Sequence, residues 1–172
     1  MPERLVHIHW QGPFSLESIS SLSNWPDDCG LYQIYAHHPV YGAGQLVYIG
    51  KAVGQTFSVR IPQHGWGSGS ENDRRNVAVY VGRLHSETPL KKIDWEISIA
   101  LAEMLLIHAH GPAYNSTHIM SINESIYPEV REARILNWGD VRALQREVSG
   151  LMWTSAAAQF DGFAQYVGGS QE

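Results

Sequence analysis

The sequence predicts an α/β (α+β) fold in which a small, antiparallel or mixed three-stranded sheet is flanked by helices, with extra helices toward the C-terminus. Two observations carry this prediction. Three segments rich in β-branched and aromatic residues are separated by loops that contain Gly or Pro: residues 31–36, 46–50 and 76–84. Residues 90–110 then repeat apolar side chains every three or four positions, as a helix does, before Gly111-Pro112 ends the pattern.

The first two strands are predicted to form an antiparallel hairpin, because a short loop with Pro39, Gly42 and Gly44 joins them. Residues 56–64 then favour a short helix with Thr56 as its N-cap. Pro62 lies inside this segment and should bend the helix, since proline removes a backbone hydrogen bond.

The length and composition of the chain favour one domain. At 172 residues, with 44% of them hydrophobic, it can bury a core without disulfides. We divide it into an N-terminal extension packed on the core (1–29), the core (30–120), a C-terminal helical extension (121–166) and a flexible tail (167–172). Within the extension, residues 129–137, 140–149 and 150–160 are interpreted as helices.

Several function classes are excluded by composition. Cys29 is the only cysteine, so neither an intrachain disulfide nor a multi-cysteine zinc site can form, and we expect Cys29 to be buried. No segment reaches the roughly 18 uninterrupted apolar residues of a membrane span. Residues 1–10 do not have the apolar core of a secretory signal, so we expect a cytoplasmic protein with no membrane contact.

The net charge of −5 argues against a tight, nonspecific coating of DNA, because proteins that neutralise phosphates usually carry excess Lys and Arg. The charge is unevenly distributed. Residues 30–120 hold seven Lys and Arg against six Asp and Glu, whereas both ends of the chain are acidic. A local cationic cleft in the middle segment is therefore compatible with the composition.

Glu103 stands out as the one carboxylate within the apolar stretch 99–107. A buried charge is costly unless a cation offsets it, so one interpretation is a metal ligand. The other is a residue at the solvent edge of an amphipathic helix, because Glu96, Glu103 and His110 recur at seven-residue steps on one stripe. Helix geometry alone leaves both open.

An ordered set of residues spans the middle of the chain. Gly30-Leu31-Tyr32 lies on the first predicted strand and Tyr48-Ile49-Gly50 on the second. Arg60 and His64 follow one helical turn apart. Glu103 lies in the long helix, and Pro112-Ala113-Tyr114-Asn115 comes after it. From Gly30 to Asn115 this set resembles the GIY-YIG nuclease family, with Leu in place of Ile in the first tripeptide.

The resemblance implies a metal-dependent endonuclease that hydrolyses DNA phosphodiester bonds, in restriction, defence, repair or the processing of mobile DNA. Glu103 would bind one Mg²⁺ or Mn²⁺, and Arg60 would clamp the phosphate. Tyr32 or Tyr48 would take a proton from the attacking water. A phenol with a pKa near about 10 needs help to do so, and Lys51 and His64 are the two candidates.

The resemblance leaves further choices open. Asn115 would position the Glu103 region or a phosphate. Arg74 and Arg75, beside a Gly/Ser-rich loop, are candidates for contacts with the DNA backbone, although surface arginines are often merely solvated. A homodimer is possible, since cutting two strands usually requires two active sites.

Each candidate also has an ordinary structural explanation. Tyr32 and Tyr48 could be common strand aromatics, Arg60 a solvated helix residue, and Asn115 a cap. The histidines have no Cys or acid at ligand spacing, so we interpret them as surface or packing residues rather than zinc ligands: His7, His9, His37, His38, His108 and His110. Two other functions compete: a weakly active or inactive GIY-YIG-like domain that binds nucleic acid or protein, and an unrelated small hydrolase.

Overall fold

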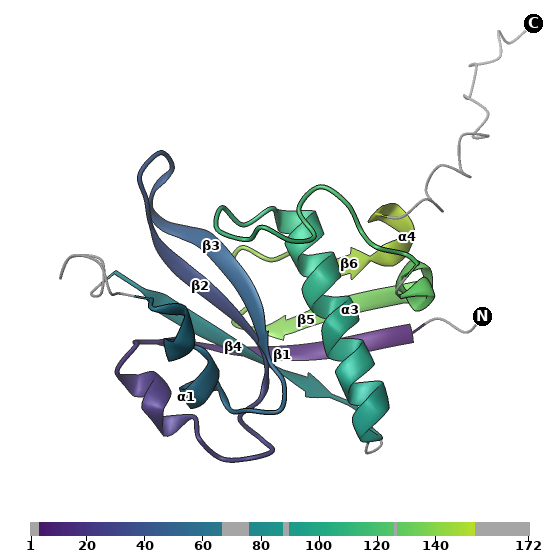
Figure 1. Cartoon of the computed structure of the whole chain (residues 1–172), viewed down its shortest axis with the longest axis horizontal. Helices are drawn as coiled ribbons and strands as arrows, with labels where there is room; N and C mark the ends of the chain where they lie inside the picture. The colour runs from purple at the N-terminus through teal and green to yellow at the C-terminus, as the bar shows by residue number, and fades with distance from the viewer. Residues whose placement is uncertain (1–3, 67–75, 88–89, 126, 154–172) are drawn as a thin grey trace, which may run out of the picture.

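The computed structural model describes residues 4–66, 76–87, 90–125 and 127–153, and these form a mixed α/β fold (Figure 1). Their strands make one sheet in the order β3-β2-β4-β1-β5-β6. Neighbouring strands are antiparallel except β1 and β5, which are parallel. The strands are β1 (Arg4–Phe14), β2 (Gly30–His38), β3 (Gly42–Ala52), β4 (Ala78–His85), β5 (Ala133–Gly139) and β6 (Glu147–Ser149).

Helices cover both faces of this sheet. They are η1 (Ser18–Ser21), α1 (Phe57–Arg60), η2 (Pro62–His64), α3 (Lys92–His110), η3 (Pro128–Glu132) and α4 (Gly150–Trp153). Successive residues of β2 belong to two different core clusters: Leu31 packs with α3, whereas Tyr32 packs with η1 and α1. Because side chains alternate across a strand, α3 and α1 lie on opposite faces of β2.

Several sequence predictions are confirmed. β2 and β3 form the expected antiparallel hairpin, and β4 is the third strand. The long helix α3 ends where Gly111 adopts a left-handed conformation with φ +53°. Pro62 divides the predicted short helix into α1 and η2, and Thr56 precedes α1 without a side-chain cap hydrogen bond. Cys29 is buried.

The helix predicted over residues 129–137 is wrong. Residues 128–132 form the short helix η3, and residues 133–139 form β5, which pairs with β1 through Val6 and Ile135. Ala133, Ile135 and Asn137 are buried while their neighbours are less so, which is the alternation of a strand. Pairing with β1 thus overrides the helical propensity of the segment.

The helix predicted over residues 140–149 is also wrong. This segment contains turns and the short strand β6, and the positive φ values of Gly139 (+72°) and Arg142 (+57°) are incompatible with a continuous helix. A helix does begin at Gly150, but residues beyond Trp153, including the predicted tail, lie outside the described residues.

The sheet is larger than the three strands predicted, because β1, β5 and β6 extend it beyond β4. Residues 4–14 of the predicted N-terminal extension form β1, which lies inside the sheet between β4 and β5. Among the described helices, none has the length and apolar character that crossing a membrane requires.

Candidate active site

The two tyrosines of the tripeptides lie side by side on the α1 face of the β2–β3 hairpin. Tyr32 pairs with Gly50 across the hairpin, and the ring centroids of Tyr32 and Tyr48 are 6.1 Å apart with their planes at 28°. A Cβ added at Gly50 would lie 2.6 Å from both Tyr32 Oη and Tyr48 Cε1. Glycine at position 50 is therefore what allows both rings to pack over the strand.

The glycine of the first tripeptide has its own physical reason. Gly30 has φ +141°, and a Cβ there would clash with the backbone oxygen of Gly82 on β4. Both glycines are thus explained by close packing around β2.

His64 makes the most direct polar contact with the tyrosine pair. Its Nε2 lies 2.9 Å from Tyr32 Oη. Burial raises the pKa of the Tyr32 phenol well above its usual range, so the phenol keeps its proton. Its hydroxyl therefore donates a hydrogen bond to the imidazole. Burial, aided by the charge of Arg60, lowers the pKa of His64, which favours the neutral imidazole that can accept this bond.

Arg60 ends α1 and brings a positive charge to the same group. Burial raises the pKa of Tyr48 as well as that of Tyr32, and the charge of Arg60 opposes both increases. The Arg60 guanidinium also donates a hydrogen bond of 3.2 Å to Gln63 Oε1. Pro62 comes two residues after Arg60, yet the bend that it causes leaves Arg60 beside the tyrosines.

Glu103 and Lys51 form an ion pair on the other side of strand β3. Lys51 Nζ lies 2.6 Å from Glu103 Oε2, and the two side chains are 38% and 14% exposed. Glu103 is thus largely buried and paired with a cation, rather than solvated at the edge of α3. Its negative charge raises the pKa of both Tyr32 and Tyr48, so it is electrostatically coupled to them.

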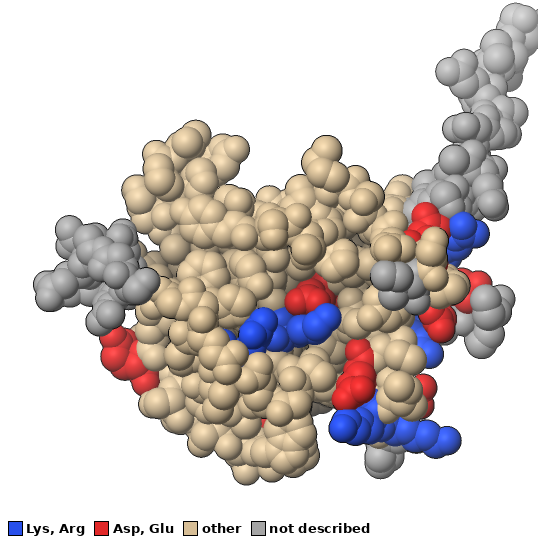
Figure 2. Space-filling view, viewed as in Figure 1, with Lys and Arg blue, Asp and Glu red and all other residues tan. Residues whose placement is uncertain are grey.

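These residues belong to two faces of one edge strand. Tyr48 and Gly50 point toward α1, whereas Ile49 and Lys51 point toward α3, and β3 has no further strand beside it in the described sheet. In the view of Figure 2, a small group of blue and red atoms lies between α1 and α3. The candidate site therefore straddles the edge of the sheet.

Asn115 forms two hydrogen bonds with the backbone of the edge strand β3. Its Nδ2 donates to the backbone oxygen of Ile49 at 2.8 Å, and its Oδ1 accepts from the backbone nitrogen of Ile49 at 2.9 Å. The neighbouring Tyr114 nitrogen donates to Val47 O at 2.8 Å. The sequence leaves open whether Asn115 positions the Glu103 region or a phosphate; in the structure its side chain is bonded to the strand that carries Tyr48 and Lys51, the ion-pair partner of Glu103.

His118 was missed at the sequence level. Burial is the largest effect and lowers the pKa of His118; the Glu103 charge raises it and the Lys51 charge lowers it, so His118 is electrostatically coupled to their ion pair. The backbone oxygen of His118 is 3.0 Å from His108 Nδ1. No local pattern could have identified His118, because it lies in an irregular segment with φ +64°.

Trp66 is the second missed residue. Its ring centroid lies 5.3 Å from that of Tyr48 and 6.2 Å from that of His64, so its indole forms a wall of the site. The sequence placed Trp66 in a Gly/Ser-rich loop, where an aromatic residue gives no periodic signal. Arg74 and Arg75, from the same loop, lie outside the described residues.

The residues of the candidate site fit a hard cation such as Mg²⁺, which binds through oxygen atoms. Among the described residues, no cluster of three or more His, Cys, Asp or Glu side chains could enclose a metal ion. Mg²⁺ commonly binds through one or two carboxylates together with substrate phosphates, and Glu103 supplies one such carboxylate. The donor set is thus compatible with a cation shared between Glu103 and a phosphate.

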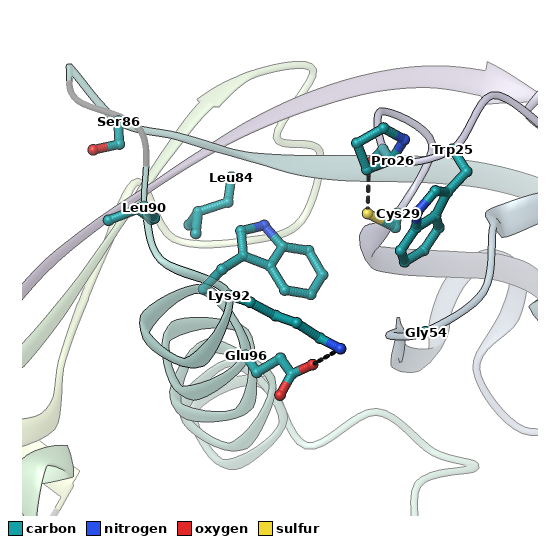
Figure 3. Close-up of a pocket in the computed structure, with 10 residues that line it drawn as sticks. Trp25, Pro26, Cys29, Gly54, Leu84, Ser86, Leu90, Lys92 and Glu96 are labelled. Carbon is teal, nitrogen blue, oxygen red and sulfur yellow. Dashed lines mark hydrogen bonds and ion pairs between the residues drawn. The ribbon is translucent and has the colours of Figure 1, made fainter.

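A separate pocket of about 520 Å³ lies away from these residues (Figure 3). Apolar side chains, including Trp25, Leu84 and Trp95, line it, and the ion pair between Lys92 and Glu96 lies at its side. None of the candidate catalytic residues faces this pocket.

Comparisons with protein-family models, with curated proteins and with solved structures found no match for this chain.

Proposed function

We propose that this chain is a metal-dependent endonuclease that hydrolyses DNA phosphodiester bonds with a GIY-YIG type active site. The observation that carries this proposal is the hydrogen bond between Tyr32 and His64 beside Tyr48 and Arg60, with Glu103 coupled to both tyrosines. A proton acceptor, a cation and a carboxylate are the groups that hydrolysis of a phosphodiester requires.

Of the two tyrosines, the geometry favours Tyr48 as the one that meets the attacking water. Tyr32 has no exposed surface, whereas Tyr48 is half-buried. Burial and the negative charge of Glu103 raise the pKa of Tyr48, and the positive charges of Arg60 and Lys51 oppose this increase. The exposed surface of Tyr48 makes it the more accessible proton acceptor.

We envisage a proton relay along these three groups. The water proton passes to Tyr48 Oη, the Tyr48 proton to Tyr32 Oη, and the Tyr32 proton to His64 Nε2, which becomes an imidazolium. The resulting hydroxide forms a bond to phosphorus as the bond to the leaving oxygen breaks. Because both phenols have raised pKa values, a concerted transfer avoids a long-lived phenolate.

Arg60 and Glu103 have complementary parts in this proposal. The fork of the Arg60 guanidinium would bind the phosphate oxygens and offset the charge that develops on them. Glu103 would hold one Mg²⁺ or Mn²⁺ against the same phosphate. When bound, such an ion polarises the phosphoryl group and stabilises the leaving oxygen.

The test is cleavage of plasmid and single-stranded DNA with Mg²⁺, Mn²⁺ or EDTA. We expect Glu103→Gln and Arg60→Ala to reduce the rate by about a hundred-fold or more. Glu96→Gln is a matched control, since Glu96 lies on the same helix and pairs with Lys92 away from the site. Absence of cleavage in every metal, or equal rates for Glu103→Gln and the wild type, would refute the proposal.

A second function is favoured by one specific observation. The net charge is −5, which argues against tight binding to DNA phosphates, whereas the acidic ends of the chain suit contact with a protein partner in a domain that binds through its cleft without cutting. Retention of DNA binding by a wild-type protein that cleaves nothing would support this alternative.

A further inference from the structure

A row of aromatic rings leads from the candidate site to the tip of the β2–β3 hairpin. Successive ring centroids are 5.3 Å apart for Tyr48 and Trp66, 6.5 Å for Trp66 and Tyr114, 5.7 Å for Tyr114 and His38, and 4.7 Å for His38 and Tyr41. We call these five residues the aromatic row. It begins at the candidate proton acceptor and ends on exposed surface.

The outer rings of the row are open to solvent. Tyr41 is 68% exposed and Tyr114 is 46% exposed, which is unusual for large side chains that could pack into a core. Exposed rings that form one continuous group are typical of a binding surface, whereas scattered single rings are not.

The row is assembled from three separate parts of the chain. His38 and Tyr41 come from the hairpin, Trp66 follows η2, and Tyr114 follows α3. The Tyr114 nitrogen is bonded to Val47 O, and Asn115 bonds both backbone atoms of Ile49, so the α3 end is fixed against β3. The rings are therefore held in place by the fold rather than by one flexible loop.

The outer part of the row, on the hairpin and the segment after α3, lies among residues without formal charge. Between Asp28 and Lys51, and again between Glu103 and Glu124, the sequence contains no Asp, Glu, Lys or Arg. The hairpin and the segment after α3 accordingly form an uncharged area at the top of Figure 2. Attraction to DNA phosphates is weak here, so a ligand must be held by stacking and hydrogen bonding.

We propose that the aromatic row binds the unpaired bases of a DNA strand and guides that strand to the tyrosine pair. Every base has a flat face that stacks on Tyr, Trp or His, so such a row accepts any sequence. In an intact duplex the base faces are covered by their neighbours and cannot reach the rings. The substrate class is therefore DNA with unpaired bases, such as a single strand or a frayed end.

This inference deepens the proposed function, but binding can be tested without cleavage. The probe is a fluorescently labelled oligothymidylate, which forms no duplex, with a duplex of equal length as the comparison. Anisotropy is measured in EDTA, so that metal-dependent cutting cannot alter the probe. We expect the single strand to bind about ten-fold or more tightly than the duplex, with a shallow dependence on salt.

The variants Tyr41→Ala and Tyr114→Ala each remove one exposed ring from the outer part of the row. We expect each to weaken binding of the oligothymidylate roughly ten-fold. Tyr114→Phe keeps the ring and should bind like the wild type. Trp25→Ala is the matched control, because Trp25 is 55% exposed but lies at the pocket of Figure 3. Circular dichroism verifies that each variant is folded.

Three results would overturn the inference. The first is single-strand binding that is absent, or unchanged in both Tyr41→Ala and Tyr114→Ala. The second is duplex binding as tight as single-strand binding and equally sensitive to these changes. The third is self-association in sedimentation that Tyr41→Ala abolishes without affecting DNA binding, which would make the row a protein interface. Binding to the row with no cleavage would refute only the nuclease proposal, and cleavage of duplex that ignores the row would refute only this inference.

Discussion

Asn115 and Asn137 each connect an irregular segment to the sheet, but they differ in burial and in position. Asn115 brackets Ile49 on the edge strand β3 and is partly exposed. Asn137 lies within β5 and is 1% exposed; its Oδ1 accepts from Trp10 Nε1 at 2.8 Å, and its Nδ2 donates to Gln145 O at 2.8 Å. One contact lies at the rim of a candidate site, and the other inside the core.

The difference separates a site half from a scaffold half. The site half, β2 and β3 with α1, η2, α3 and the loop after α3, carries all the candidate catalytic residues that the structure describes. The scaffold half, β1, β5 and β6, carries none of them. Its polar groups are instead satisfied internally, as buried groups must be. Substitutions in the scaffold half should therefore affect stability, and substitutions in the site half should affect DNA cleavage more than stability.

The largest expected effect is that of Asn137→Ala. It leaves Trp10 Nε1 buried without its acceptor, so we expect the free energy of unfolding to fall by about 2–4 kcal/mol. Urea denaturation measures this change. On a Trp10→Phe background, which removes the donor, Asn137→Ala should cost less. An equal loss in the free energy of unfolding on the two backgrounds would contradict the role given to this hydrogen bond. In the folded Asn137→Ala protein, we expect the rate of DNA cleavage per molecule to stay unchanged.

Gly50→Ala and Gly82→Ala test the contrast between the site half and the scaffold half, because each adds a methyl group at a closely packed position. A Cβ at Gly50 meets both tyrosines, whereas a Cβ at Gly82 on β4 would lie 2.7 Å from Ile8 Cγ2 and 2.8 Å from the Trp10 ring, both on β1 of the scaffold half. Both Ala variants should lose about 1–3 kcal/mol of stability. Gly50→Ala should additionally slow cleavage about ten-fold or more, because it displaces the reacting groups. If Gly82→Ala slows cleavage by folded protein as much as Gly50→Ala, the two halves are not functionally distinct.

The site half was largely predictable from the sequence because its signals are local. The hairpin, the Pro62 break and the long helix follow from turn residues and periodicity, and they bring Tyr32, Tyr48 and His64 together. His118 and Trp66 escaped because nothing in their irregular segments indicates which distant strand they approach.

The scaffold half was predicted poorly because its structure depends on distant pairing. The segment that forms β5 contains strong helix formers, and its strand character becomes clear only when β1 lies beside it. Asn137 obscured the apolar alternation, since its burial depends on Trp10, which is far away in the sequence. Parallel pairing between distant segments gives no short-range signal.

A smaller effect is expected at Asn115. Asn115→Ala removes two partly exposed hydrogen bonds, so stability should fall by about 1 kcal/mol. Cleavage should slow more than this loss suggests, because the strand that carries Tyr48 and Lys51 is released. Asn115→Asp sharpens the test: it keeps the acceptor for Ile49 N but faces Ile49 O without a donor. We expect Asn115→Asp to reduce stability and cleavage at least as much as Asn115→Ala. Wild-type stability and cleavage in Asn115→Asp would contradict the role of the two hydrogen bonds to Ile49.

The smallest expected effect is a pH dependence at His110, which joins the two halves. Gln145 N donates to its Nε2 at 2.9 Å, so its Nδ1 carries the proton that is bonded to Leu106 O at 2.8 Å. Burial, the dominant cause, lowers the pKa of His110 below its ordinary 6.5, because the charged form is poorly solvated. Between this lowered pKa and 6.5, the unfolded chain binds more protons than the folded one.

The free energy of unfolding should therefore rise with pH through that window and become level, for this group, above 6.5. Urea denaturation from about pH 5 to about pH 8 measures the slope. His110→Gln does not titrate, so its curve should lose part of the acid slope. His64 and His118 also have lowered pKa values and contribute a slope of the same sign. An acid slope that is identical in His110→Gln and the wild type would show that His110 is not held neutral between the halves. The contrast between the two halves would then be supported only by Asn115 on β3 and Asn137 on β5.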